Sequence, residues 1–186
     1  MPGLKFRVLL DSDKNEEVFR DILISDTSDF ESFYHAIMKS FDFNGDQMAS
    51  FYVSNEDWDK GHEISLLDMS YDDDSIDSPA TVMKTAILKD FLEEPDQRFI
   101  LVYDFMKMWI FLIELIGYDR NEPSEAEMLL AIGNAPKEES REALEEELFQ
   151  DNAHISSDEE EDEFGFDEFD DDYADDDLSD YNEYDY

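Results

Sequence analysis

Alternating apolar and polar residues near the start of the chain predict two strands. Residues 5–11 and 18–24 are rich in apolar and β-branched side chains, and a polar turn at residues 11–15 separates them. Two such runs joined by a short polar segment are typical of an antiparallel hairpin. Residues 48–53 have the same character and predict a further strand.

A helix is predicted over residues 30–41. Ser28 and Glu31 stand three residues apart, as in a capping box, and Asn44-Gly45 is a typical end signal. The apolar side chains fall at offsets 0, 3, 4, 7, 8 and 11, which is the spacing of one helical face: Phe30, Phe33, Tyr34, Ile37, Met38 and Phe41.

The second half of the chain predicts another hairpin and several helices. Residues 98–105 and 108–116 are apolar, aromatic and β-branched runs, which favours two further strands. Capping and stop signals indicate helices over three segments, residues 85–92, 123–133 and 138–149. Residues 68–78 are acidic and predict a loop. The pattern therefore indicates a single α+β domain, with an antiparallel sheet of about four to five strands and helices packed on one face.

Charge divides the chain into two parts. The 186 residues include 53 acidic and 13 basic side chains, a net charge of −40. Residues 156–186 hold 17 of the acids and no base, which leaves 36 acids and all 13 bases in residues 1–155, a net charge of −23. A block of one sign repels itself and stays extended. We therefore expect a folded domain over residues 1–150 and a disordered acidic tail over residues 151–186.

The tail also contains aromatic residues at irregular intervals. Their spacing follows neither a helical nor a strand period, which argues against a packed element. Aromatic rings among carboxylates resemble bases along a single nucleic-acid strand, and we expect them to occupy the stacking pockets that bases fill on single-strand-binding surfaces. The candidate partner-binding residues of the tail are Phe164, Phe166, Phe169, Asp170, Asp171, Asp172 and Tyr173.

Composition excludes several classes of function. The chain has no cysteine, so disulfides, thiol catalysis and cysteine-ligated metals are excluded. Asp42-x-Asn44-x-Asp46 begins like a calcium loop but lacks the glycine and glutamate that follow in an EF-hand, and we expect no metal and no cofactor. The negative charge argues against direct contact with nucleic-acid phosphates or anionic lipid. With no run of roughly 18 apolar residues, we expect a cytoplasmic protein that does not enter membranes; its oligomeric state stays open.

Residues 5–138 resemble the Ri-plasmid ORF-three-like family of the pRiA type, also labelled a transposable-element passenger protein. The resemblance rests on the first hairpin with Arg20, on the Tyr34-His35 pair and on residues 99–105 followed by Trp109, which are similar to the family's Tyr-x-Tyr-Asp-Phe-Gly-Asp-x-Trp motif. Residues 133–138 are similar to its Gly…Ala-Pro-Pro-Glu segment. Met106-Lys107 departs from the motif's Gly-Asp. The resemblance implies a compact α+β domain and no particular activity.

Candidate site residues cluster at the end of the second hairpin. Asp104 lies between the apolar residues Tyr103 and Phe105 and close to Trp109, so we expect a small-molecule or partner site to include Tyr103, Asp104 and Trp109. A carboxylate at a hairpin end also commonly bonds its own turn, and that interpretation stays open. His35, on the polar side of the helix, is a weaker candidate, since such histidines are most often structural.

Two hypotheses of function follow. In the first, the protein is a non-catalytic acidic interaction module that binds a basic partner and masks its nucleic-acid-binding surface as a nucleic-acid mimic. In the second, a small-molecule or catalytic site lies near Tyr103, Asp104 and Trp109. We favour the first, because the chain has neither a phosphate-binding glycine loop nor a nucleophile beside a base.

Overall fold

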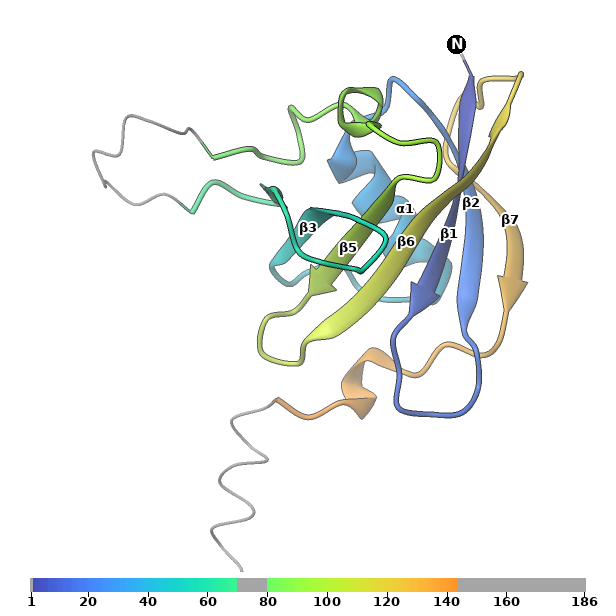
Figure 1. Ribbon diagram of the computed structural model, residues 1–186. Coiled ribbons are helices and arrows are strands. Elements are labelled where there is room, and N and C mark those ends of the chain that lie inside the picture. Colours follow the sequence, from blue (N-terminus) through green and yellow to red (C-terminus); the bar gives the residue numbers. More distant parts are fainter. Residues whose placement is uncertain (1, 70–79, 144–186) are drawn as a thin grey trace, which may run out of the picture.

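The computed structural model describes residues 2–69 and 80–143. These residues form one sheet, one α-helix and two 3₁₀ helices (Figure 1). The helices are α1 (Phe30–Phe41), η1 (Leu88–Phe91) and η2 (Glu138–Ser140). The strands are β1 (Gly3–Leu10), β2 (Phe19–Ser25), β3 (Ala49–Ser54), β4 (Glu63–Ser65), β5 (Arg98–Tyr103), β6 (Trp109–Asp119) and β7 (Glu127–Ile132).

The sheet has seven strands in the order β4-β3-β5-β6-β1-β2-β7. Every neighbouring pair is antiparallel. The central pairing joins β1 to β6, which come from opposite ends of the domain sequence, with a register shift between Lys5 and Phe6. Short β4 and the longer β7 are the two edges, so β7 has a strand neighbour on one side only within the described residues.

The predicted hairpins and the antiparallel sheet are confirmed, but the predicted sheet is too small. It lacks β4, which is only three residues long, and β7. Residues 123–133 were predicted to be helical from a capping signal at their start and a stop signal at Gly133. The sequence of β7, Glu-Met-Leu-Leu-Ala-Ile, is also rich in good helix formers. Pairing with β2 overrides this local preference, because β2 is buried along nearly its whole length and β7 supplies the strand neighbour on its second side.

The predicted set of helices is likewise reduced to one α-helix. Residues 85–92 contain only the 3₁₀ helix η1, and residues 138–149 begin with the single turn η2, beyond which residues 144–149 lie outside the described residues. The helix α1 has the predicted bounds, but its N-cap is Asp29 rather than Ser28. The Asp29 carboxylate accepts a hydrogen bond from the Ser32 backbone N–H at 2.7 Å. The fold is therefore mostly β.

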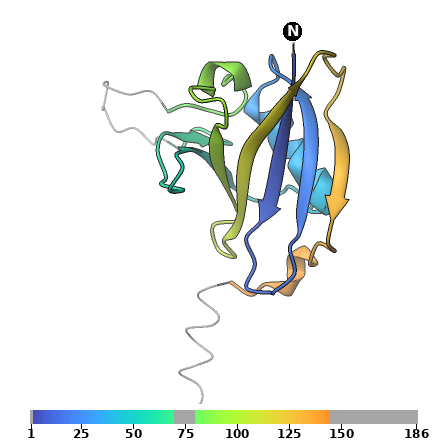
Figure 2. The ribbon, with the colours of Figure 1, turned by 45° about the vertical axis from the view of Figure 1, so that its right-hand side comes forward.

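The hydrophobic core lies between α1 and one face of the sheet, as Figure 2 shows. Aromatic rings from the helix meet rings from the strands. The Phe33 ring lies 4.8 Å from that of Phe6 and stacks on Phe51 at 5.7 Å, and Phe30 meets Phe99 edge-on. Offset and edge-on ring pairs contribute roughly 0.5–1.5 kcal/mol beyond the area they bury. This core fixes α1 to the sheet.

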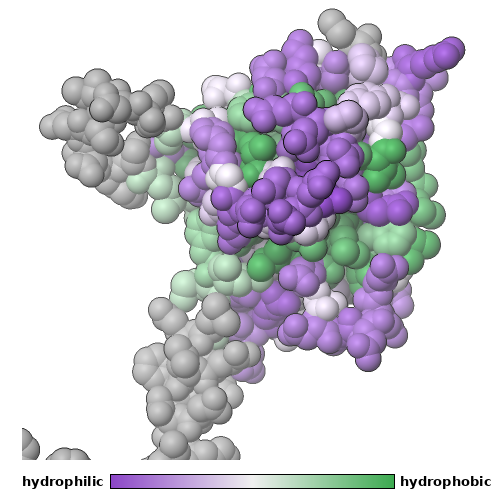
Figure 3. Space-filling view, viewed as in Figure 1, coloured by the Kyte–Doolittle hydropathy of each residue, from purple (hydrophilic) through white to green (hydrophobic). Residues whose placement is uncertain are grey.

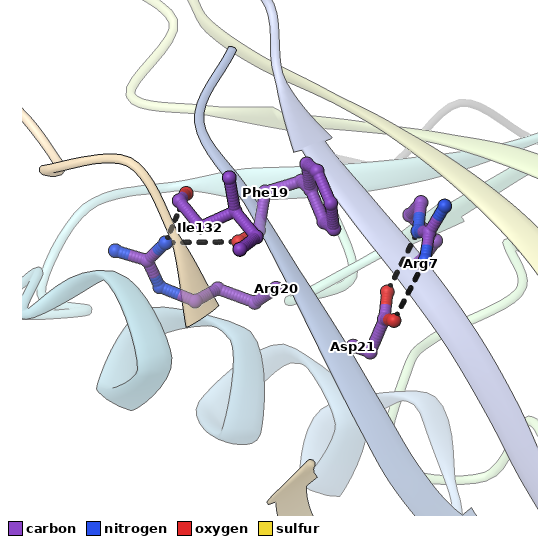
Figure 4. A network of polar contacts seen from close by, with 5 residues as sticks. All are labelled: Arg7, Phe19, Arg20, Asp21 and Ile132. Carbon is purple, nitrogen blue, oxygen red and sulfur yellow. Dashed lines mark hydrogen bonds and ion pairs between the residues drawn. The ribbon is translucent and has the colours of Figure 1, made fainter. Parts of the chain in front are cut away.

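The other face of the sheet carries charged pairs among apolar side chains. The Arg7 guanidinium forms a two-pronged ion pair with the Asp21 carboxylate, with both N–O distances 2.8 Å, and it lies over the Phe19 ring (Figure 4). The pKa of Arg7 is raised, chiefly by its hydrogen bonds to Asp21. The pairing holds β1 to β2 on the side away from α1.

Candidate functional site

The candidate residues lie at one end of the sheet, where many segments meet. Strands β1, β5 and β7 end there, β2 and β6 begin there, and α1 reaches its C-terminus (Figure 1). Residues 133–143 cross this end and bring η2 beneath the strands (Figure 1). This arrangement brings together the turn at residues 104–108, the loop at residues 42–48 and η2.

Tyr103 is the centre of a buried polar network at this end. Its hydroxyl donates to Glu138 Oε1 at 2.6 Å and accepts from the backbone N–H groups of Gly45 and Asp46 at 3.1 and 3.3 Å. The other carboxylate oxygen of Glu138 accepts from the Asn44 N–H at 2.7 Å. Burial, and then the Glu138 carboxylate, raises the pKa of Tyr103. The network therefore links three segments through satisfied hydrogen bonds.

Asp104 is used by its own turn. Its Oδ1 accepts hydrogen bonds from the backbone N–H groups of Met106 and Lys107 at 3.0 and 3.2 Å. Its backbone has a φ of +58°, a conformation that aspartate tolerates better than most residues. The residue is 6% exposed, and its carboxylate lies within this turn. These contacts agree with the alternative interpretation of the sequence, in which a carboxylate at the hairpin end bonds its own turn.

Trp109 begins β6 and is 2% exposed. Its ring meets Phe43 edge-on, and the Arg141 guanidinium lies over its face, 4.3 Å from the ring centre. Its indole N–H has no hydrogen-bond partner within residues 2–69 and 80–143. Trp109 also lines an open cavity of about 600 Å³, together with Lys14, Asn134 and Arg141.

His35 does not join the other candidates. Its side chain is exposed on the outer side of α1 and lies 3.8 Å from the Glu31 carboxylate, one turn earlier. The neighbouring Tyr34 is buried in the core, where its ring lies 6.2 Å from that of Tyr103, and it also lies 5.1 Å from the exposed His35 ring. Burial raises the pKa of Tyr34, with smaller contributions from Asp46 and Glu138.

Two residues that hold this end together were not predicted as site residues. Glu138 is buried, although its sequence context, Lys-Glu-Glu-Ser, indicates an exposed helix start. Arg20 is 6% exposed and donates from Nη1 to the carbonyl oxygens of Phe19 at 2.9 Å and Ile132 at 2.8 Å (Figure 4). Its Nε donates to the Ser40 carbonyl at 2.9 Å, so Arg20 joins the ends of β7 and α1. The sequence signal for both residues was the family resemblance, which included Arg20 in the first hairpin and Glu138 at the end of residues 133–138.

Other predicted sites cannot be placed in this way. The tail candidates from Phe164 to Tyr173 and residues 70–78 of the predicted acidic loop lie outside the described residues. Within residues 2–69 and 80–143, no group of three or more histidines and carboxylates is arranged to hold a metal ion. In the same ranges, no helix has the length and apolarity needed to cross a membrane.

The fold and this polar network define a small, mostly β domain whose candidate site is built from structural hydrogen bonds. The family model of the plasmid pRiA4b ORF-3-like protein matches residues 2–179. The chain therefore belongs to the plasmid pRiA4b ORF-3-like family. The match extends beyond residues 5–138 into the acidic tail, so the predicted range of the family resemblance was too short.

A solved structure is similar in fold. The crystal structure of MM3350, a protein of unknown function from Methanosarcina mazei Go1, matches with a TM-score of 0.60 and 19% sequence identity. The match covers 85% of this chain and 84% of that chain. At this identity the likeness shows the fold alone. No curated protein matches the chain.

Proposed function

We propose that this protein is a non-catalytic acidic interaction module that binds a basic protein. The observation that carries the proposal is the excess of acids: residues 1–155 hold 36 acidic and 13 basic side chains, and residues 156–186 add 17 acids. Within the described residues, lysine and arginine form ion pairs with carboxylates at Lys5, Arg7 and Arg98. An acidic field of this size attracts basic partners and speeds their association.

The chemistry of the candidate site supports a non-catalytic role. A general acid or base needs a titratable group positioned to reach a substrate. Here the Tyr103 hydroxyl and the Glu138 carboxylate are bonded to each other and to backbone N–H groups, and the Asp104 carboxylate is bonded to the backbone N–H groups of its own turn. These groups stabilise the end of the sheet, and their hydrogen bonds explain their burial without a ligand.

The partner we propose is a basic nucleic-acid-binding protein, and the tail acts as a nucleic-acid mimic. An extended chain advances roughly 3.3–3.6 Å per residue, so 17 acids in 31 residues place one carboxylate about every 6 Å. A single nucleic-acid strand carries one phosphate about every 3.4 Å. The tail is thus a sparser polyanion, and its aromatic rings supply the stacking that bases provide.

The proposal is tested by capture of host proteins on three full-length chains. One is unchanged, one carries Asp170→Asn, Asp171→Asn and Asp172→Asn, and one carries Phe164→Ser, Phe166→Ser and Phe169→Ser at unchanged charge. We expect the unchanged chain to capture basic proteins at low salt and release them as salt shortens the Debye length from about 30 Å to 8 Å. We expect weaker capture by both variants, and competition by single-stranded nucleic acid.

Identical capture by all three chains would contradict the mimic role of the tail. Capture that does not respond to salt would contradict the electrostatic basis of the whole proposal, because contacts between exposed charges are screened by salt.

A second candidate function is favoured by the unpaired indole N–H of Trp109. An unpaired buried donor costs about 1–3 kcal/mol, and the cavity beside Trp109 also presents Lys14 and Arg141. Asp13, Glu16 and Glu142 also line the cavity, so a small organic acid would have to bind on the side formed by Trp109 and Arg141. In a Trp58→Phe chain, which leaves Trp109 as its one tryptophan, benzoate or citrate should change the fluorescence saturably. An unchanged spectrum at millimolar concentrations would reject this candidate.

A further inference from the structure

The free edge of the sheet at β7 is apolar and exposed. All six residues Glu127–Ile132 are exposed, including Met128 at 54%, Leu129 at 48%, Leu130 at 43% and Ile132 at 41%. Figure 3 views the face of the sheet away from α1 and shows hydrophobic residues along the margin where β7 runs. Soluble proteins usually protect an edge strand with lysine, proline or a covering segment. The strand β7 contains neither lysine nor proline.

The apolar side chains of β7 lie on both faces of the sheet. Leu130 and Ile132 are opposite Asp21 and Phe19, on the face away from α1, whereas Met128 is opposite Ile22, whose side chain is in the core. A register shift between the Asp21–Leu130 and Ile22–Met128 pairs leaves residue 129 unpaired and changes the face on which the following side chains lie. One added strand at this edge would therefore cover apolar side chains on both faces, which a flat surface contact could not do.

The backbone of β7 has room for such a strand. Within the described residues β7 pairs with β2 alone, so its other side presents a row of main-chain donors and acceptors without a strand partner. Extended segments bind edges of this kind through main-chain hydrogen bonds, and alternate side chains give specificity. Arg20 holds the Ile132 carbonyl, which fixes the end of β7 in position for pairing.

Charge determines which strand fits. Glu122, Glu125 and Glu127 lie at the start of β7, and all three are exposed. At its end, Gly133 is packed against the backbone of Glu17, which is exposed together with Glu16. In an antiparallel pair of two β7 strands the start of one meets the end of the other, so a second copy would bring these acids together. The acidic tail would meet the same repulsion.

We propose that the free edge of β7 binds an extended segment of a different protein, in which apolar and basic residues alternate. The expectation that this segment is positively charged rests on the proposed function. The free edge of β7 adds the place where the segment binds and its extended conformation. Its apolar residues cover Leu130, Ile132 and Met128, and its basic residues reach the acids at the two ends of β7.

The test uses the full-length chain and two ten-residue peptides of identical composition. One alternates lysine and valine, and the other has five lysines followed by five valines. A variant with Leu130→Lys and Ile132→Lys blocks the edge. Its control, Leu67→Lys with Met69→Lys, adds the same charge at residues that are 59% and 54% exposed near the opposite edge, and thermal unfolding checks that both variants fold. Titration calorimetry gives the affinities, and hydrogen exchange follows the amides of β7.

We expect the alternating peptide to bind at least about tenfold more tightly than the block peptide. That preference should disappear in the β7 variant, persist in the control, and be accompanied by slower exchange at residues 127–132. Equal binding of both peptides, unaffected by the β7 variant, would overturn the edge proposal and leave the acidic module standing. Failure of both peptides to bind would overturn both proposals. A dimer in light scattering that the β7 variant dissociates would overturn the choice of partner, because the edge would then hold a second copy.

Discussion

Replacing Tyr103 by phenylalanine tests whether the buried network holds this end of the domain together. The change removes one oxygen atom, and with it the bonds to Glu138 at 2.6 Å and from Gly45 and Asp46 at 3.1 and 3.3 Å. The Glu138 carboxylate and two backbone N–H groups then lose a partner. At about 1–3 kcal/mol for each buried group left unpaired, and less where water reaches it, we expect a loss of about 3 kcal/mol.

Urea unfolding of the full-length chain measures this loss, and the matched control is Tyr118→Phe. Tyr118 is 53% exposed, so its substitution should change the free energy of unfolding by less than about 0.5 kcal/mol. For a domain of this size, a loss of 3 kcal/mol lowers the melting temperature by about 6–12 °C. A double-mutant cycle with Glu138→Ala isolates the pair, and we expect a coupling energy of about 1–3 kcal/mol.

Two results would refute the reasoning. One is a Tyr103→Phe protein as stable as the Tyr118→Phe protein, since the hydroxyl would then contribute nothing beyond its ring. The other is strict additivity of Tyr103→Phe and Glu138→Ala, since residues that share a buried hydrogen bond should couple.

Three further predictions concern pH, Arg20 and a glycine. Burial raises the pKa values of Tyr34 and Tyr103, so the folded chain keeps protons that the unfolded chain loses from about pH 10 upward. The free energy of unfolding should therefore fall as pH rises above about 10, and titration of a chain with both tyrosines changed to phenylalanine should show a weaker fall. Arg20→Met should lower the free energy of unfolding in urea by about 3–5 kcal/mol and speed hydrogen exchange in β7, because it leaves buried carbonyls without a donor. Arg20→Lys should restore only part of the lost stability. Wild-type exchange rates in the methionine variant would contradict the role of Arg20 in holding β7. Gly133→Ala should cost more than about 2 kcal/mol in thermal unfolding, because φ is +77° and a Cβ would overlap the Glu17 carbonyl oxygen. Gly117→Ala, where a Cβ meets nothing within 4 Å, is its control, and equal effects of the two changes would reject this explanation.

The elements that could be predicted each have a pattern of apolar residues within their own sequence. The helix α1 was predicted with its bounds because six apolar residues at helical spacing determine which side is buried. The five inner strands were predicted because each is a run rich in apolar, aromatic or β-branched residues. These elements carry their information locally, so no knowledge of neighbouring segments was needed.

The elements that were missed depend on contacts distant in sequence. The strand β7 forms because β2 offers an unpaired side about a hundred residues earlier, and nothing within Glu127–Ile132 signals that. Glu138 is buried because Tyr103 and the Asn44 N–H meet it. Tyr103, Asp104 and Trp109 were predicted from their apolar surroundings, which indicate burial correctly but do not distinguish a hydrogen bond to the protein from one to a ligand.

The central pairing of β1 with β6 has a consequence for how the chain folds during synthesis. One half of the sheet, β4-β3-β5-β6, joins the other half, β1-β2-β7, only through this pair. The ribosome must therefore complete β6, which ends at residue 119 of 186, before the two halves of the sheet can pair. Until then the apolar face of β1 has no β6 to pair with. Pairings this distant in sequence form slowly, since loop closure precedes any gain from contacts. The growing chain therefore holds an exposed hairpin and helix through most of its synthesis, a period in which acidic side chains that repel other chains protect it from aggregation.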